Sequence, residues 1–167
     1  GVRFEIQEFV PHGSLGDMAR TEGPVLPDAR LAEVVSEITS ALTHVHGFGM
    51  VHRDLKPQNV LVRKLDPLDL VLADFGLATL VANSHTMRSG SRTPAYGAPE
   101  AAHGDVSPAR DWWALGIMLV ELLTGTHPFR RPDGNWMEDA EISIHLSTRP
   151  IDLSRIENER WALLCRG

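Results

Sequence analysis

Apolar residues recur at two different spacings along this chain, and the spacing separates expected helices from expected strands. Between residues 31 and 45 the apolar positions lie three or four residues apart, as on one face of an α-helix: Leu31, Val34, Val35, Ile38, Leu42 and Val45. The pattern predicts a helix with Asp28 as its N-cap. Gly47 and Gly49 end it, because glycine favours the last turn of a helix.

The most apolar segment predicts a second long helix, over residues 107–123. Ser107 is expected as its N-cap and Pro108 at its first helical position, and Gly125 ends it. Apolar residues surround the axis of this helix, which predicts a central, buried position. Shorter helices are expected at Ser14–Ala19, with Ser14 as the cap, and at about Ile156–Cys165.

Three shorter runs have the character of strands. A strand is predicted at residues 3–10, where Phe4 and Ile6 alternate with Glu5 and Gln7, as in a half-buried strand. Residues 59–62 and 70–73 predict a strand pair that turns at Asp66-Pro67. From Thr79 to Pro94 the chain is rich in serine, threonine and glycine, and this indicates a loop. The expected fold is therefore mainly α, helical with a few short strands.

Composition limits the class of protein. The chain has 167 residues, 43% hydrophobic and 23% charged, which is enough for one domain with a core of its own. A net charge of −6 gives no support to nucleic-acid binding. The longest apolar run, Ala114–Val120, is too short to cross a bilayer, and Cys165 is the single cysteine. We therefore expect a cytoplasmic location, without membrane contact from this segment.

The candidate chemistry lies in the stretch His52-Arg53-Asp54-Leu55-Lys56-Pro57-Gln58-Asn59. Asp54, Lys56 and Asn59 supply an acid, a cation and an amide between a helix and a strand. Phosphoryl transfer to a hydroxyl uses these three groups, as base, charge partner and metal ligand. Asp74-Phe75-Gly76 follows, and Ala98-Pro99-Glu100 closes the polar loop.

Together these motifs resemble the hinge and C-terminal lobe of a eukaryotic-type (Hanks-type) Ser/Thr protein kinase. The resemblance implies a kinase-like lobe that transfers the γ-phosphoryl of ATP, with Mg²⁺, to Ser or Thr hydroxyls of protein substrates. Residues 1–167 are then a partial kinase domain. The Gly-rich loop, the strand lysine, the helix that pairs with it and the far C-terminal end are missing from the sequence. We expect this fragment to be inactive alone.

The resemblance also assigns roles at the expected active site. Asp54 would be the base and Lys56 would contact the transferred phosphoryl. Asn59 and Asp74 would hold Mg²⁺, which prefers hard oxygen ligands. Thr93 falls on the family's threonine that contacts the catalytic Asp and Lys. Arg92 before it departs from the usual glycine.

On the nucleotide side, backbone groups of Glu8 and Val10 would hydrogen-bond the adenine. Leu61 would form the floor under the adenine, and Ser14 would contact the ribose. Asp74 would complete the ATP contacts. Gln7 would be the gatekeeper.

Three residues are expected to support this site. His52 would pack and hydrogen-bond beneath the loop, and Asp111 would hold the loop's backbone. Arg53 would pair with a phosphate placed on the polar loop, for which Ser89, Thr86 and Ser91 are the close candidates. His46, like His44, is interpreted as structural or solvated.

Two alternatives remain. The first is a catalytically inert, pseudokinase-like binding module, favoured by the missing small lobe but not by the four intact catalytic-type side chains. The second is a small-molecule phosphotransferase, which would share the acid and amide spacing. Such enzymes usually lack the Asp-Phe-Gly and Ala-Pro-Glu motifs that bound a long loop here. Each side chain also has a plain interpretation, as a loop acid, a turn amide or a strand-end acid.

Overall fold

The computed structural model describes residues 8–23, 25–80, 94–103 and 106–166. Its elements, in chain order, are α1 (Leu15–Glu22), α2 (Asp28–Gly47), β1 (Met50–Val51), η1 (Pro57–Asn59), β2 (Val60–Leu65), β3 (Leu68–Leu72), η2 (Phe75–Leu77), β4 (Thr79–Leu80), η4 (Pro94–Tyr96), η5 (Pro99–His103), α3 (Ala109–Thr124), α4 (Asp139–Thr148) and α5 (Glu159–Arg166). This part of the chain is mainly helical, as predicted.

Helix α2 forms as its pattern requires. Leu31, Val34, Ile38 and Leu42 are all fully buried, and Gly49 has a φ of 70° just after the last turn. The predicted cap is wrong, however. Pro27 is the N-cap and Asp28 is the first helical residue, so its carboxylate is available for other contacts.

The Asp28 carboxylate instead binds the far end of the chain. Its Oδ2 accepts a hydrogen bond from Asn158 Nδ2 at 2.7 Å, and its Oδ1 accepts one from Trp161 Nε1 at 3.0 Å. Trp161 lies in α5 and Asn158 directly precedes it. The first turn of α2 is thereby joined to the last described helix.

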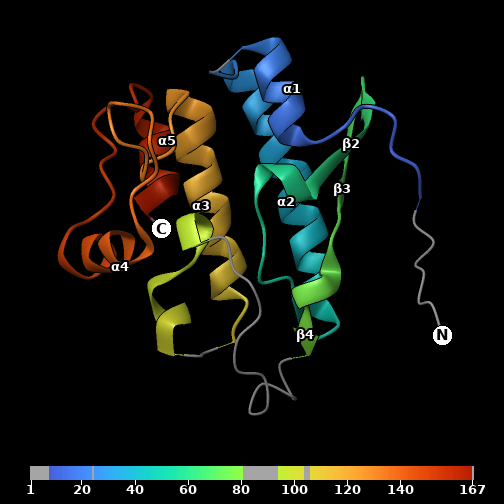
Figure 1. Ribbon diagram of the computed structural model, residues 1–167. Coiled ribbons are helices and arrows are strands. Elements are labelled where there is room, and N and C mark those ends of the chain that lie inside the picture. The colour runs from blue at the N-terminus through green and yellow to red at the C-terminus, as the bar shows by residue number, and fades with distance from the viewer. Residues whose placement is uncertain (1–7, 24, 81–93, 104–105, 167) are drawn as a thin grey trace.

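Helix α3 is the central helix of the fold (Figure 1). Nine of its residues are buried, including Ala114, Leu115 and Met118, which confirms the predicted central position. Pro108, rather than Ser107, is its N-cap, and no side chain caps it. Gly125 ends the helix with a φ of 68°, in the left-handed region where glycine is unstrained.

The strands form two small antiparallel pairs. β2 pairs with β3, with Val60 opposite Leu72, and the hairpin turns at Asp66-Pro67 as predicted. β1 pairs with β4, which the sequence pattern did not predict. The strand predicted at residues 3–10 is not seen at residues 8–10, and the rest of it lies outside the described residues.

These elements place the loop from His52 to Asn59 between the two strand pairs. The β2–β3 hairpin packs on α2, and α1 covers η1 and the start of β2, while α5 packs on α3 and α4 lies against η4 (Figure 1). Among the described residues, no helix has the length and apolar character needed to cross a membrane.

Candidate active site

The loop that begins at His52 is held by one buried carboxylate. Asp111, in the first turn of α3, is 1% exposed. Its Oδ2 accepts the backbone N–H of His52 at 2.8 Å and its Oδ1 that of Arg53 at 2.9 Å. Arg53 has a φ of 73°, an uncommon value for a residue with a side chain. The two hydrogen bonds stabilise that backbone conformation, as expected for Asp111.

His46 is a third partner of the same carboxylate. Its Nε2 lies 2.8 Å from Asp111 Oδ2, and its ring packs edge-on against Trp112. Of the two interpretations of His46, structural or solvated, the structural one is therefore correct. The sequence did not predict that His46 would contact Asp111, the residue that holds the loop. Helical spacing could not indicate this contact, because α2 and α3 are far apart in sequence.

Asp54, Lys56 and Asn59 come together as one hydrogen-bonded group. Lys56 Nζ donates to Asp54 Oδ2 at 2.7 Å, and Asn59 Nδ2 donates to the same oxygen at 3.0 Å and to the Asp54 carbonyl at 2.8 Å. The side chains of Asp54 and Lys56 are 10% and 22% exposed, and Asn59 is buried. The Asp54 carboxylate is thus largely shielded from water.

Asn59 and Asp74 lie at the same end of the β2–β3 hairpin. Asn59 directly precedes β2, and its carbonyl accepts the N–H of Ala73 at 2.8 Å, one residue before Asp74. Asp74 is exposed, with a φ of 59°, and its Oδ1 accepts the N–H of Gly76 at 3.3 Å. An amide and a carboxylate oxygen are ligands that suit Mg²⁺.

His52 ties the loop to this hairpin end. It is fully buried, and its Nε2 donates to the Ala73 carbonyl at 2.9 Å while its ring packs against Phe75 at 4.8 Å. The prediction that His52 packs and hydrogen-bonds beneath the loop is confirmed. No group of three or more metal-ligating His, Cys, Asp or Glu side chains occurs within the described ranges.

The predicted nucleotide-side residues have different surroundings. Leu61 is partly exposed between buried Val60 and Val62, so it faces away from the core and borders the backbone of Ser14. The Ser14 hydroxyl donates to Asp17 Oδ2 at 2.6 Å and caps α1. The ribose contact of Ser14 stays a prediction.

The remaining predicted residues lie near the ends of the described ranges or outside them. Glu8 is exposed, and its Oε2 lies 3.5 Å from Arg63 Nη1, whereas Val10 is half-buried. Gln7 and Thr93, like the three candidate phosphorylation sites, lie outside the described residues. Their assigned roles stay predictions.

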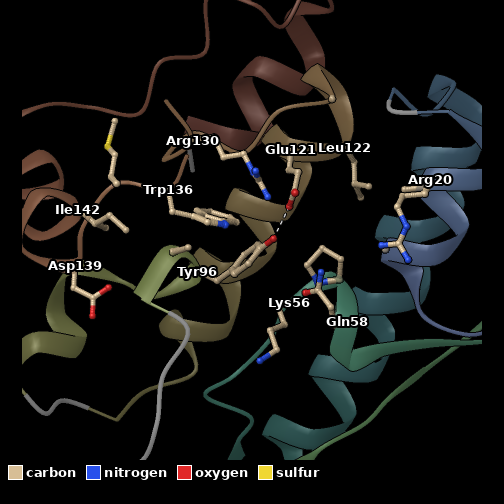
Figure 2. Close-up of a pocket in the computed structure, with 16 residues that line it drawn as sticks. Arg20, Lys56, Gln58, Tyr96, Glu121, Leu122, Arg130, Trp136, Asp139 and Ile142 are labelled. Atoms are coloured by element: carbon tan, nitrogen blue, oxygen red, sulfur yellow. Dashed lines mark hydrogen bonds between the residues drawn. The ribbon is translucent and has the colours of Figure 1, made fainter. Parts of the chain in front are cut away.

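A cavity of about 850 Å³ adjoins the Asp54 group (Figure 2). Lys56 and Gln58 line one side of it, Tyr96 lies opposite, and Arg20 of α1 and Ile142 of α4 form further walls. Lys56 therefore borders the cavity and also hydrogen-bonds Asp54. The sequence analysis did not identify this cavity.

A half-buried acid, Glu121, and a buried phenol, Tyr96, line the cavity. The Tyr96 hydroxyl donates to Glu121 Oε2 at 2.5 Å (Figure 2). Burial raises the pKa of Glu121, and burial together with the Glu121 charge raises the pKa of Tyr96. One sequence signal could have drawn attention to Glu121, since it is the single acid within the apolar run that follows Asp111 in α3.

Comparison with known proteins adds to this geometry. A family profile described as "Protein kinase domain" matches residues 3–162. The chain is 36% identical over 140 residues to serine/threonine-protein kinase RAD53 of Saccharomyces cerevisiae, covering 75% of the chain and 17% of that protein. It is 36% identical over 128 residues to myosin light chain kinase A of Dictyostelium discoideum, covering 75% of the chain and 43% of that protein.

A bacterial relative matches over more of the chain. Serine/threonine-protein kinase PknB of Mycobacterium leprae is 35% identical over 159 residues, which covers 91% of this chain and 24% of that protein. The chain thus spans less than half the length of each of these three relatives.

Proposed function

The chain belongs to the protein kinase family, and from that premise we propose that the protein carrying it transfers the γ-phosphoryl of ATP to Ser or Thr hydroxyls of other proteins. The observation that carries this proposal is the Asp54 carboxylate, which accepts hydrogen bonds from both Lys56 and Asn59. Such transfer depends mainly on positioning and charge, which this group supplies.

In this proposal Asp54 orients the attacking hydroxyl and takes its proton. The Lys56 and Asn59 hydrogen bonds fix the carboxylate's direction, and a carboxylate held in this way can accept the proton of a substrate hydroxyl. Lys56 Nζ, held 2.7 Å from that carboxylate, places a positive charge where the moving phosphoryl gains negative charge. Asp111 and His52 hold the loop and act through it.

Asn59 and Asp74 are the residues that would hold Mg²⁺. The Asn59 amide nitrogen points at Asp54, so its oxygen is the atom available as a ligand. Magnesium, when bound, would offset the charge of the ATP phosphates. The common hairpin end that carries both residues supports this assignment.

The nucleotide side of the proposal rests on the family resemblance. Glu8 and Val10 would bind the adenine through their backbones, Leu61 would lie beneath it, and Ser14 would meet the ribose. Thr93 would contact Asp54 and Lys56. We also propose that residues 1–167 form a partial kinase domain, because the sequence contains no G-x-G-x-x-G stretch followed by a strand lysine.

The test is transfer from ATP by the full-length protein with Mg²⁺ and a generic Ser/Thr protein substrate, compared with its Asp54→Asn variant. Loss of the base should lower the rate by about 10²–10⁴-fold. Asp66→Asn, the same change at the exposed hairpin turn, is the matched control and should retain activity. Equal rates for Asp54→Asn and the unaltered protein would exclude the proposed base. Absence of transfer, with partner binding that Asp54→Asn leaves unchanged, would instead favour a binding module.

A further inference from the structure

The segment that would contact the adenine, residues 8–14, runs beside the β2–β3 hairpin before it enters α1 (Figure 1). The end of this segment is fixed to β2 through the backbone. The N–H of Val62 donates to the Gly13 carbonyl at 2.8 Å, and Ser14 forms an isolated antiparallel bridge with Leu61. A different kind of contact holds the start of the segment.

That contact is an ion pair between Glu8 and Arg63. Glu8 Oε2 lies 3.5 Å from Arg63 Nη1. Arg63 is held in turn by Asp69 of β3, whose two carboxylate oxygens accept hydrogen bonds from Arg63 Nε and Nη2, each at 2.9 Å. A bidentate contact of this kind fixes a guanidinium group in one orientation. The hydrogen bond from Arg63 also holds the pKa of Asp69 below its usual value, so Asp69 stays charged at neutral pH.

An irregularity of the hairpin gives the Arg63 side chain its position. Val62 pairs with Leu70 and Lys64 pairs with Asp69, so Arg63 is the extra residue of a β-bulge in β2. Bulges change the direction of a side chain and are frequent beside functional sites. The strand position two residues before Arg63 is the one expected beneath the adenine. The bulge therefore lies next to the expected nucleotide site, on the side of the segment that begins with Glu8.

The geometry points to Arg63 as a positioning residue for the nucleotide, which holds the start of the adenine-contact segment against β2 through its ion pair with Glu8. This inference rests on the function proposed above, in which the backbones of Glu8 and Val10 bind the adenine. The side chains of Arg63 and Glu8 are 41% and 57% exposed, so water screens the ion pair and its effect is modest. Arg63 lies four positions after Asn59, about 13 Å along an extended strand. Loss of the ion pair should therefore affect nucleotide binding more than the transfer step.

The first test measures the Kd for ATP with Mg²⁺, and the KM for ATP and kcat, in the full-length protein. Arg63→Ala and Glu8→Gln should each raise the Kd and KM by about two- to fivefold and change kcat by less than about twofold. Glu8→Gln leaves the contact between Arg63 and Asp69 in place, so its effect does not come from damage to the hairpin. Lys64→Ala is the matched control. It removes the same charge one position further along, where Lys64 Nζ lies 4.0 Å from Asp69 Oδ2, and it should leave the Kd unchanged.

A double-mutant cycle assigns the two effects to one contact. If Arg63 and Glu8 act on the nucleotide through each other, the combined Arg63→Ala and Glu8→Gln variant should raise the Kd no further than either change alone. Arg63→Lys keeps the charge but loses the bidentate contact with Asp69, so its Kd should lie between those of the unaltered protein and Arg63→Ala. Equal Kd values in all variants, additive effects in the double variant, or an equal effect of Lys64→Ala would overturn the inference.

Amide hydrogen exchange separates this inference from the proposed function, because it needs no nucleotide. Residues 8–12 should exchange about two- to fivefold faster in Arg63→Ala and Glu8→Gln than in the unaltered protein or Lys64→Ala. If ATP binds but exchange and Kd are unchanged in both variants, the kinase function stands and the role of Arg63 is excluded. If the unaltered protein binds no ATP, the proposed function fails, and the exchange rates still decide whether Arg63 holds this segment.

Discussion

At the residue scale, His127 is a buried imidazole with one hydrogen bond. It is 1% exposed, and its Nδ1 accepts the N–H of Phe129 at 3.1 Å. Its Nε2 has no hydrogen-bond partner among the described residues. Burial, and next the charge of Arg130, lower the pKa of His127 from 6.5 to about 4.

This makes the stability of the protein sensitive to acid. The unfolded imidazole binds a proton below pH 6.5, whereas the folded one resists protonation until about pH 4. The stability that neutral His127 contributes is therefore fully present above the pKa of the unfolded state. It is lost as the pH falls towards the pKa of the folded state. Between pH 7 and pH 5 the free energy of unfolding should drop by about 1–2 kcal/mol from this group.

Urea unfolding at both pH values checks this prediction. His127→Asn keeps a hydrogen-bond acceptor but does not titrate, so its stability should fall less with pH. His44→Asn changes an exposed imidazole and should leave the dependence as it is. An unchanged dependence in His127→Asn would refute the assignment.

At the scale of the element, Ser14 stabilises the N-terminus of α1 as its N-cap. Its hydroxyl accepts the N–H of Asp17 at 3.2 Å, and Asp17 in return accepts the N–H of Ser14 at 2.8 Å. Ser14→Ala should lower the free energy of unfolding by about 1 kcal/mol, measured by urea titration. Ser40→Ala, at an exposed position inside α2, should change it by less than about 0.5 kcal/mol. Equal effects would show that the cap contributes nothing.

Elements also show which features the sequence could predict. Helix α2 and the β2–β3 hairpin follow from apolar spacing and turn residues, so both were predicted. The caps of α2 and α3 were each misplaced by one residue. Pro27 and Pro108 are the N-caps, and neither has a side chain that can accept a capping hydrogen bond.

The contacts of the candidate site also include some that the sequence predicted and some that it did not. The motif predicted that Asp54, Lys56 and Asn59 would lie together, because their spacing within one loop is short. The His46–Asp111 contact and the Tyr96–Glu121 pair join segments 65 and 25 positions apart. Such contacts depend on how helices pack, which no local pattern encodes.

At the scale of the whole molecule, Asp111 connects α3, α2 and the catalytic-type loop. Its carboxylate has partners on His46, His52 and Arg53. Asp111→Asn presents an NH₂ where one of these donors points, so the free energy of unfolding should fall by about 1–3 kcal/mol. For a domain of this size each kcal/mol lowers Tm by about 2–4 °C, which calorimetry can measure.

A double-mutant cycle isolates the histidine's share of that loss. His46→Ala and Asp111→Asn, alone and combined, should show a coupling energy of about 0.5–3 kcal/mol. Asp66→Asn combined with His46→Ala should be additive, because Asp66 lies at the turn between β2 and β3 whereas His46 lies near the end of α2. Additivity in both pairs would mean that His46 does not stabilise Asp111.

The hydrogen bonds from Asp28 to Asn158 and Trp161 join residues 130 and 133 positions apart. A ribosome releases the two ends of this contact at very different times. Once α3 has emerged, a growing chain already contains Asp54, Lys56 and Asn59 together with Asp111, whose carboxylate holds their loop. It still lacks α4, which walls the cavity, and α5, which fastens α2. We therefore expect the Asp54, Lys56 and Asn59 group to be assembled during synthesis before the contact that joins α2 to α5.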